Sequence, residues 1–203
     1  MRPMSFVRKI ALIVLAASAA AFILYVIVQS LASPKGAQNP LKSLATGAMQ
    51  ELVFLPAPPA QPQDAFDGPD GKVTLADFRG KPVLLNLWAS WCGPCVAEMP
   101  SLSALQKTMG GKDFMVLTVN MDRSKADATG FLNKANISNL PLYRDSSFAL
   151  AQKLSVPGAP SGLPLSVLYD KDGREQARLS GGADWNSDAA HTLIAAVQDG
   201  RGR

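Results

Sequence analysis

Residues 83–100 read VLLNLWASWCGPCVAEMP and contain the strongest structural signal in the sequence. Its first six residues form an apolar run with the length of a β-strand that is buried on both faces. Cys92 and Cys95 follow, separated by Gly93 and Pro94. This dipeptide favours a turn into a helix, because proline needs no N–H in a first helical turn. The stretch therefore predicts a buried strand, a short turn and a helix that begins at the cysteines.

The two cysteines are better suited to reaction than to structural support. They are the only two among the 203 residues, and a disulfide between them would close almost no loop and add little stability. At a helix N-terminus the unpaired N–H groups and the macrodipole favour negative charge, so the pKa of Cys92 should fall below that of a free thiol. We expect Cys92 to attack, or to be attacked, and the sheltered Cys95 to resolve the mixed disulfide.

A metal site is the main alternative for such a pair. Structural zinc normally takes four Cys or His ligands, whereas this chain has one histidine, His191, far along the sequence. Zinc is therefore disfavoured, but a two-thiolate Cu(I) site stays open because Cu(I) prefers soft sulfur. We expect no metal, and no cofactor beyond a redox-active disulfide between Cys92 and Cys95.

The N-terminal part of the chain has the pattern of a membrane anchor. Residues 1–9 contain Arg2, Arg8 and Lys9, and residues 10–28 (IALIVLAASAAAFILYVIV) carry no charge. A helix of that length would span roughly 28 Å, close to a hydrocarbon core of about 30 Å. We expect residues 1–9 in the cytoplasm, residues 10–31 as a transmembrane anchor and the rest outside. A cleaved signal peptide is the alternative, and it would export the remainder as well.

The remainder of the chain is nearly neutral. The net charge is +4, from 20 basic and 16 acidic residues. Taking away the three basic residues before residue 10 leaves 17 basic residues against 16 acidic ones. This balance lacks the electrostatic footprint of nucleic-acid binding, so we expect no nucleic-acid partner.

A Pro-rich tether and one folded domain should follow the anchor. Six prolines punctuate residues 32–64, which predicts a tether over most of this stretch. Met49–Leu55 (MQELVFL) is the exception and could form a short packed segment, and residues 65–200 should form the domain. Asp172-Gly173 is a hairpin turn signal, and Ser187 is expected to cap the last helix. Further strands are expected at 114–119, 165–169 and 176–180, and further helices at 126–135, 147–154 and 187–197. This order predicts an α/β fold with a mixed sheet and helices on both faces.

The stretch 83–100 resembles the thioredoxin superfamily and, within it, the TlpA/ResA/CcmG branch of membrane-anchored proteins, with the TlpA-like members most similar. The likeness runs through most of residues 65–198, including DFRGK at Asp77–Lys81 and Leu163-Pro164. It implies a thioredoxin fold, in which a central mixed β-sheet is flanked by helices. It further implies an N-terminal extension, an inserted segment over residues 139–162 and one preceding transmembrane helix.

The resemblance adds Glu98 to the catalytic residues. Thioredoxin has a buried Asp at the position of Asn86, and Asn cannot exchange protons. The branch instead carries an acid in C-x-x-C-x-x-E, and Glu98 occupies that place. A partly buried carboxylate there would have a raised pKa and could take the proton of Cys95. The alternative is a solvated acid favoured by the helix dipole.

The resemblance also implies a substrate-binding loop. Leu163-Pro164 matches the cis-proline loop of the superfamily, which would lie beside Cys92. Without the resemblance, a trans proline before a strand would be the default. The residues expected to bind substrate are Trp91, Gly93, Pro94, Leu163 and Pro164.

The function implied by the resemblance is that of a thiol:disulfide oxidoreductase in the inner membrane, with its catalytic domain in the periplasm. Gly-Pro between the cysteines is typical of reductants, and a DsbD/CcdA-like membrane protein would supply electrons. The implied substrates are cysteine pairs in cytochrome oxidase copper-site assembly, such as those of a Sco-like copper chaperone or an oxidase subunit. A CcmG/ResA-like reductant of apocytochrome c is the alternative, and a Cu(I)-binding chaperone is a third.

Overall fold

The computed structural model describes residues 15, 17–26, 39–159 and 161–202. The chain divides into two compact units, Met1–Gln38 and Asn39–Arg203. In the first unit, residues 15 and 17–26 are helical. The predicted segment 1–9 and part of the predicted span 10–31 lie outside the described residues. Within the described ranges, no helix is long and apolar enough to cross a membrane.

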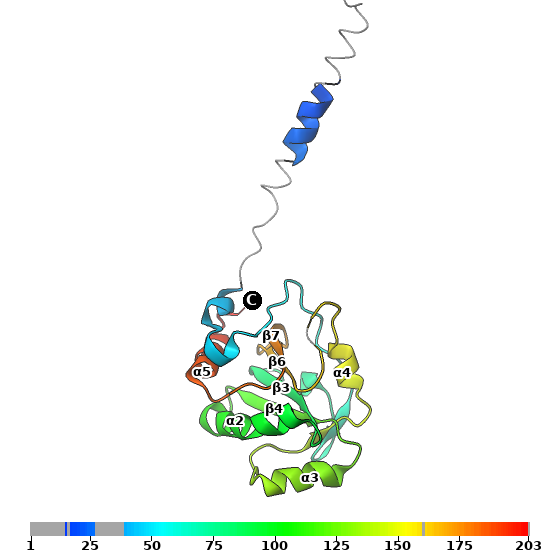
Figure 1. Cartoon of the computed structure of the whole chain (residues 1–203), viewed down its shortest axis with the longest axis vertical. Coiled ribbons are helices and arrows are strands. Elements are labelled where there is room, and N and C mark those ends of the chain that lie inside the picture. Colours follow the sequence, from blue (N-terminus) through cyan, green and yellow to red (C-terminus); the bar gives the residue numbers. More distant parts are fainter. Residues whose placement is uncertain (1–14, 16, 27–38, 160, 203) are drawn as a thin grey trace, which may run out of the picture. The chain divides into compact units, whose positions relative to one another are not determined.

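The second unit contains one seven-stranded mixed sheet with the strand order β2-β1-β5-β4-β3-β6-β7 (Figure 1). The central strand β3 pairs in parallel with β4 and antiparallel with β6. The strands are β1 (Phe66–Gly68), β2 (Gly71–Val73), β3 (Val83–Trp88), β4 (Met115–Asn120), β5 (Tyr143–Arg144), β6 (Leu165–Tyr169) and β7 (Glu175–Ser180). All six residues of β3 are buried, so the middle of the sheet is covered on both faces.

Helices connect these strands, and their starts follow ordinary capping chemistry. Ser124 and Ser187 cap α3 and α5, because their side chains accept hydrogen bonds from N–H groups of the first turn. The α-helices are α2 (Gly93–Met109), α3 (Lys125–Lys134), α4 (Ala149–Leu154) and α5 (Asp188–Gln198). The 3-10 helices are η1 (Pro40–Leu44), η2 (Gly47–Met49) and η3 (Leu75–Phe78). The predicted mixed α/β architecture is confirmed.

The folded unit begins earlier than the sequence predicts. Residues 39–55 fall in the expected tether 32–64, but the structure packs them onto the domain. The packed segment considered at Met49–Leu55 is confirmed, whereas the packing of residues 39–48 was not expected. Leu41 and Met49 are fully buried in the core, and η1 and η2 both contact α5. Val53 exchanges two backbone hydrogen bonds with Arg178 of β7, at 2.8 and 3.0 Å. The sequence gives little sign of this packing, because a few isolated apolar side chains anchor the segment and form no periodic pattern.

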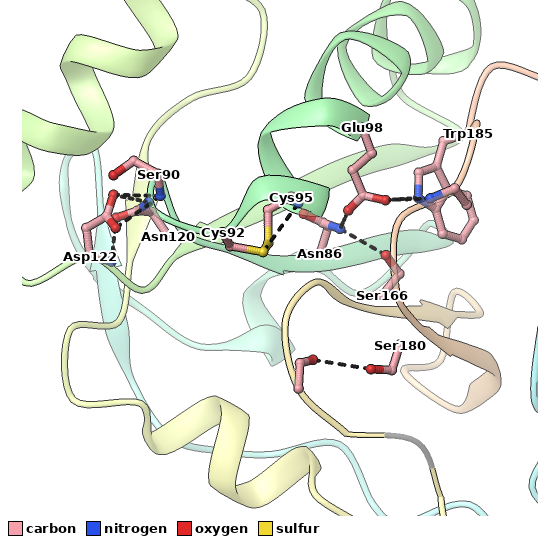
Figure 2. The surroundings of a disulfide bond; sticks show 12 residues. Asn86, Ser90, Cys92, Cys95, Glu98, Asn120, Asp122, Ser166, Ser180 and Trp185 are labelled. Carbon is pink, nitrogen blue, oxygen red and sulfur yellow. Dashed lines mark hydrogen bonds between the residues drawn. A yellow bond between two sulfur atoms is a disulfide. The ribbon is translucent and has the colours of Figure 1, made fainter.

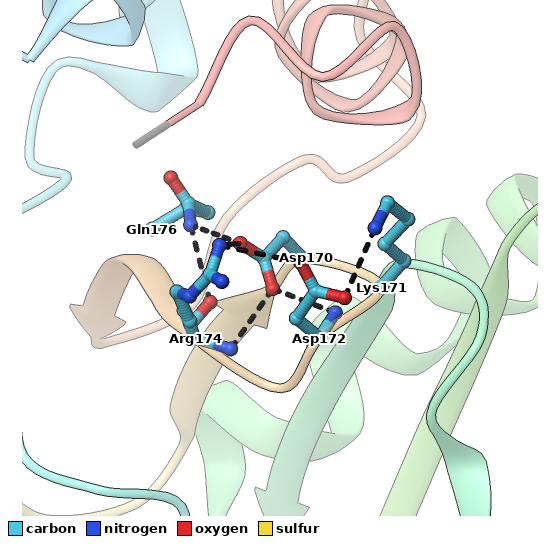
Figure 3. A network of polar contacts seen from close by, with 5 residues as sticks. All are labelled: Asp170, Lys171, Asp172, Arg174 and Gln176. Carbon is cyan, nitrogen blue, oxygen red and sulfur yellow. Dashed lines mark hydrogen bonds and ion pairs between the residues drawn. The ribbon is translucent and has the colours of Figure 1, made fainter.

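The β6–β7 hairpin confirms the predicted turn at Asp172-Gly173. Asp170 holds the turn, because its Oδ1 accepts the backbone N–H groups of Asp172 and Arg174, each at 2.9 Å (Figure 3). Gly173 has φ +79, in the left-handed region that favours glycine. A Cβ on Gly173 would lie 2.7 Å from Oε1 of Gln61. The backbone therefore favours glycine here, and a larger residue would also have to displace the Gln61 side chain.

We predict that Gly173→Ala destabilises the fold by about 1–2 kcal/mol, because alanine is disfavoured in the left-handed region. The free energy of unfolding in urea measures the effect. Gly130→Ala is the control, since Gly130 lies inside α3 and a Cβ there meets nothing within 4 Å. The control should be neutral or stabilising by up to about 1 kcal/mol. Equal stability of Gly173→Ala and the unsubstituted chain would contradict this account of the turn.

Candidate active site

The two cysteines lie at the start of helix α2, which follows strand β3 after a short loop. Cys92 is the N-cap residue of α2, and its Sγ accepts a hydrogen bond from the backbone N–H of Cys95 at 3.3 Å. The two sulfurs form a disulfide with an S–S distance of 2.06 Å (Figure 2). Cys92 is 7% exposed, whereas Cys95 is completely buried. The structure therefore gives the two sulfurs the unequal access that the sequence predicts.

This geometry sets the chemistry of the reduced pair. The helix N-terminus directs an N–H group and the positive end of its dipole at Cys92, so a thiolate there is stabilised. Cys95 lies one turn further along the same helix and has no access to solvent. A substrate can therefore meet only Cys92, and Cys95 can act only on a disulfide that Cys92 has formed.

A carboxylate that the sequence analysis did not identify holds the loop before Cys92. Asp122 follows β4 and is 1% exposed. Its two oxygens accept the backbone N–H of Ser90 at 3.1 and 3.2 Å, and Asn120 donates to one of them at 2.9 Å (Figure 2). The available signal was the pattern Asn-x-Asp directly after a buried strand, since parallel strands bring such ends to one edge of the sheet. Asp122 thus fixes the backbone that presents Trp91 and Cys92.

Glu98 lies on the buried face of α2 and is not solvated. It is 4% exposed, and both of its carboxylate oxygens accept hydrogen bonds. Oε1 accepts from Nδ2 of Asn86 at 2.7 Å, and Oε2 accepts from the Ala183 N–H at 3.0 Å and from Nε1 of Trp185 at 3.2 Å (Figure 2). Burial raises the pKa of Glu98 above its usual range, and these hydrogen bonds oppose the rise. The predicted direction of the pKa shift is confirmed, and the role of Trp185 as a donor to Glu98 is new.

Glu98 also borders a depression on the surface, here called the Glu98 hollow. Its volume is about 560 Å³. It is lined by Pro94, Ala97, Glu98, Pro100, Ser101, Gly182, Ala183 and Asp184. The carboxylate therefore stands between the buried helix face that carries Cys95 and a hollow that is open to water. A proton that reaches Glu98 has a short route to solvent.

The expected cis-proline loop is present. The Leu163-Pro164 peptide bond is cis, and Pro164 directly precedes β6. Leu163 and Cys92 border one apolar depression of about 410 Å³, here called the Cys92 hollow. Its other lining residues are Leu87, Trp91, Phe148, Ala151, Ser155, Ser161, Gly162 and Leu165. The inserted segment contributes α4 and its flanking residues to the lining of the Cys92 hollow. The sequence predicted the inserted segment but not which of its residues lie at the site.

The predicted substrate-binding residues do not all share this hollow. Trp91 is 66% exposed and lines it together with Leu163. Gly93 and Pro94 are exposed at the start of α2, and Pro94 borders the Glu98 hollow instead. Pro164 is buried beneath the loop. Among the described residues, no group of three or more His, Cys, Asp and Glu side chains is placed to hold a metal ion.

Comparison with known proteins places this geometry in a family. The sequence profile of the AhpC/TSA family matches residues 56–176, which is more than half of the chain. The chain belongs to the AhpC/TSA family. Among its relatives within this thioredoxin-like family are proteins named for thiol–disulfide chemistry, as the disulfide at the start of α2 leads one to expect.

Two relatives show the range of the similarity. The thiol-disulfide oxidoreductase ResA of Bacillus thuringiensis is 31% identical over 110 residues, which are 54% of this chain and 61% of ResA. The thiol:disulfide interchange protein DsbE of Pseudomonas aeruginosa is 31% identical over 129 residues, or 61% of this chain and 67% of that protein. The chain thus spans about three fifths of the length of its ResA relatives.

Solved structures agree on the fold. The structure of a proposed DsbE of Chlorobium tepidum has a TM-score of 0.60 and 31% identity, and the match covers 68% of this chain and 95% of that one. A secreted thiol-disulfide isomerase of Corynebacterium glutamicum has a TM-score of 0.58 and 25% identity, with 72% and 93% covered. The thioredoxin-like fold and the predicted resemblance to the branch that contains ResA are thereby confirmed.

The raised pKa of Glu98 predicts a pH-dependent loss of stability in the oxidised chain. The folded chain holds this proton above pH 4.5, the usual pKa of the group, where the unfolded chain has released it. The contribution is therefore complete below 4.5 and is lost as the pH rises through the interval up to the raised pKa. Glu98→Gln has no such proton.

Urea unfolding of both chains between about pH 4 and about pH 8 checks this prediction. The free energy of unfolding of the unsubstituted chain, minus that of Glu98→Gln, should decrease as the pH rises. Subtracting the free energy of unfolding of Glu98→Gln removes the pH dependence that the other titrating groups contribute to both chains. A difference that is constant or increases with pH would show that Glu98 does not hold a raised pKa.

Proposed function

We propose that this chain is a thiol-disulfide oxidoreductase of the ResA/DsbE type, with Cys92 and Cys95 as its redox centre. The observation that carries the proposal is the unequal pair at the start of α2. Cys92 borders an apolar hollow and its sulfur accepts the backbone N–H of Cys95, whereas Cys95 is fully buried. The names of the relatives support the same chemistry.

The reaction follows from this placement. The Cys92 thiolate attacks one sulfur of a substrate disulfide, the substrate S–S bond breaks, and the other substrate sulfur leaves as a thiolate. Cys95 then loses its proton and attacks Sγ of Cys92, which forms the Cys92–Cys95 disulfide and releases the second substrate thiolate. Two electrons pass from the pair to the substrate. Glu98, three residues beyond Cys95, is the group we assign to receive the proton.

The Cys92 hollow suggests what kind of substrate docks. Its lining is mainly apolar, and Trp91 offers an exposed ring at its border. An extended peptide that carries an apolar side chain next to its cysteine would bury that side chain in the hollow while presenting its sulfur to Cys92. Protein disulfides, rather than small thiols alone, are therefore the proposed substrate class.

We further propose a direction, a location and partners on the basis of the resemblance to the TlpA/ResA/CcmG branch. The chain would act as a reductant, held at the inner membrane by residues 10–31 with its catalytic domain in the periplasm. A DsbD/CcdA-like membrane protein would supply electrons. The substrates would be cysteine pairs of cytochrome oxidase copper-site assembly factors, with apocytochrome c as the alternative.

Substitution of each cysteine tests the activity. Cys92→Ser should lower insulin disulfide reduction to the uncatalysed rate, because the only accessible sulfur is gone. Cys95→Ser should instead accumulate a stable mixed disulfide through Cys92, because the resolving sulfur is missing. Mass spectrometry of the protein trapped by Cys95→Ser in cells distinguishes an oxidase assembly factor from an apocytochrome. Retention of full activity in Cys92→Ser would refute the proposal.

Filling the Cys92 hollow tests the substrate class. Ala151→Trp should raise KM for a protein disulfide roughly tenfold, equivalent to about 1.4 kcal/mol, with a smaller effect on a small-molecule disulfide. Gln152→Trp is the matched control, because Gln152 is exposed on the same helix and does not line the hollow. Equal KM values for Ala151→Trp and Gln152→Trp would show that substrates bind elsewhere.

A further inference from the structure

Asn86 carries a buried polar atom that the oxidised protein leaves unsatisfied. The residue lies in the middle of β3 and is completely buried. Its amide Nδ2 donates to Oε1 of Glu98 at 2.7 Å and to Oγ of Ser166 at 2.9 Å. Its carbonyl Oδ1 has no hydrogen-bond partner among the described residues. A buried carbonyl without a donor is unfavourable, so this arrangement calls for a reason.

Exchanging the two ends of the amide would not remove the problem. When Glu98 is ionised, its carboxylate only accepts hydrogen bonds, so the group of Asn86 that faces it at 2.7 Å has to be the donor Nδ2. The carbonyl is therefore fixed on the other side of the side chain by the partners of the nitrogen. The unsatisfied atom is a consequence of the network and is not a free choice of rotamer.

The carbonyl lies toward the buried cysteine. Cys95 and Glu98 are three residues apart on α2 and share the helix face that covers Asn86. Figure 2 shows Asn86 between these two side chains, with its nitrogen toward Glu98 and its oxygen on the side of Cys95. In the oxidised state the sulfur of Cys95 is bonded to Cys92 and carries no hydrogen. A sulfur on this side of the amide therefore has no proton to donate to the carbonyl in this redox state.

We propose that Asn86 is a positioning residue whose carbonyl accepts the S–H of Cys95 once the disulfide is reduced. The inference rests on the proposed redox function. A dithiol reductant supplies two electrons, which break the S–S bond, and one proton, which Cys95 takes while Cys92 stays a thiolate. The resulting thiol of Cys95 is fully buried and needs an acceptor. The one amide then holds the Cys95 thiol on its oxygen side and the Glu98 carboxylate on its nitrogen side.

This contact would make the reduced state more favourable. The carbonyl is satisfied only after reduction, so the amide stabilises the dithiol relative to the disulfide. It would also place the thiol proton one amide away from Glu98, the group assigned to receive it. Where thioredoxin has a buried Asp, this chain has Asn86. Its amide would hold the Cys95 thiol proton in a hydrogen bond but could not take the proton up.

The S–H stretching vibration of Cys95 is the direct test. The chain has two cysteines, so Cys92→Ala leaves Cys95 as its only thiol and removes the competing sulfur. The S–H band of this variant should lie at the low frequency of a hydrogen-bonded thiol. Adding Asn86→Leu should move it to the frequency of a free thiol, whereas adding Ser166→Ala, which retains the carbonyl, should leave it in place.

A redox equilibrium gives a second measurement in the chain with both cysteines. Asn86→Leu should favour the disulfide roughly fivefold against glutathione, the effect of one hydrogen bond, which is about 20 mV toward a stronger reductant. Ser166→Ala should leave the equilibrium unchanged. A structural role alone would move neither the band nor the equilibrium in this selective way.

The outcomes separate the two proposals. A free-thiol band in Cys92→Ala itself would overturn the role of Asn86, even if Asn86→Leu fails to fold. A band that Asn86→Leu leaves unmoved would overturn it as well. Neither result bears on disulfide reduction by the unsubstituted chain, which tests the oxidoreductase function independently.

Discussion

The site depends on one contact, the hydrogen bond from the backbone N–H of Cys95 to Sγ of Cys92 at 3.3 Å. It exists because a helix begins directly beneath the first sulfur, and a helix begins there because Gly93 and Pro94 make the turn. The same helix places Cys95 one turn inward, out of reach of solvent. In the proposed reaction, the accessibility of Cys92, its activation and the order of attack therefore all depend on the start of α2.

The strands hold this helix start in place. β3 is buried along its whole length and delivers the chain to Cys92. Asp122, at the end of the parallel neighbour β4, fixes the intervening loop through the backbone of Ser90. On the inner side, Glu98 ties α2 to β3 through Asn86 and to the segment before α5 through Trp185. The redox pair thus lies between two buried polar networks, each centred on one carboxylate.

Local signals in the sequence were sufficient for the centre of this arrangement. The strand–turn–helix of residues 83–100, the hairpin at Asp172-Gly173 and the cap at Ser187 each depend on neighbouring residues, and each is confirmed. The cis bond at Pro164 and the burial of Glu98 required the family resemblance. Spacing alone could not distinguish a buried acid from a solvated one.

Contacts between distant segments were not predictable from the sequence. Trp185 donates to Glu98 across 87 positions, and nothing in the local sequence of either residue indicates the other. The short strands β1 and β5 have three and two residues, which is too few to show alternation. Leu41 enters the core as an isolated side chain, so the segment before Met49 resembled a tether.

The charge on Cys92 is the quantity that tests this account most directly. In the reduced Cys95→Ser chain, Cys92 is the only cysteine, and its ultraviolet thiolate absorbance can be followed against pH. Stabilisation by the start of α2 predicts a pKa of Cys92 well below the value of about 8.5 for a free thiol. A pKa at or above about 8.5 would mean that the helix N-terminus does not activate this sulfur.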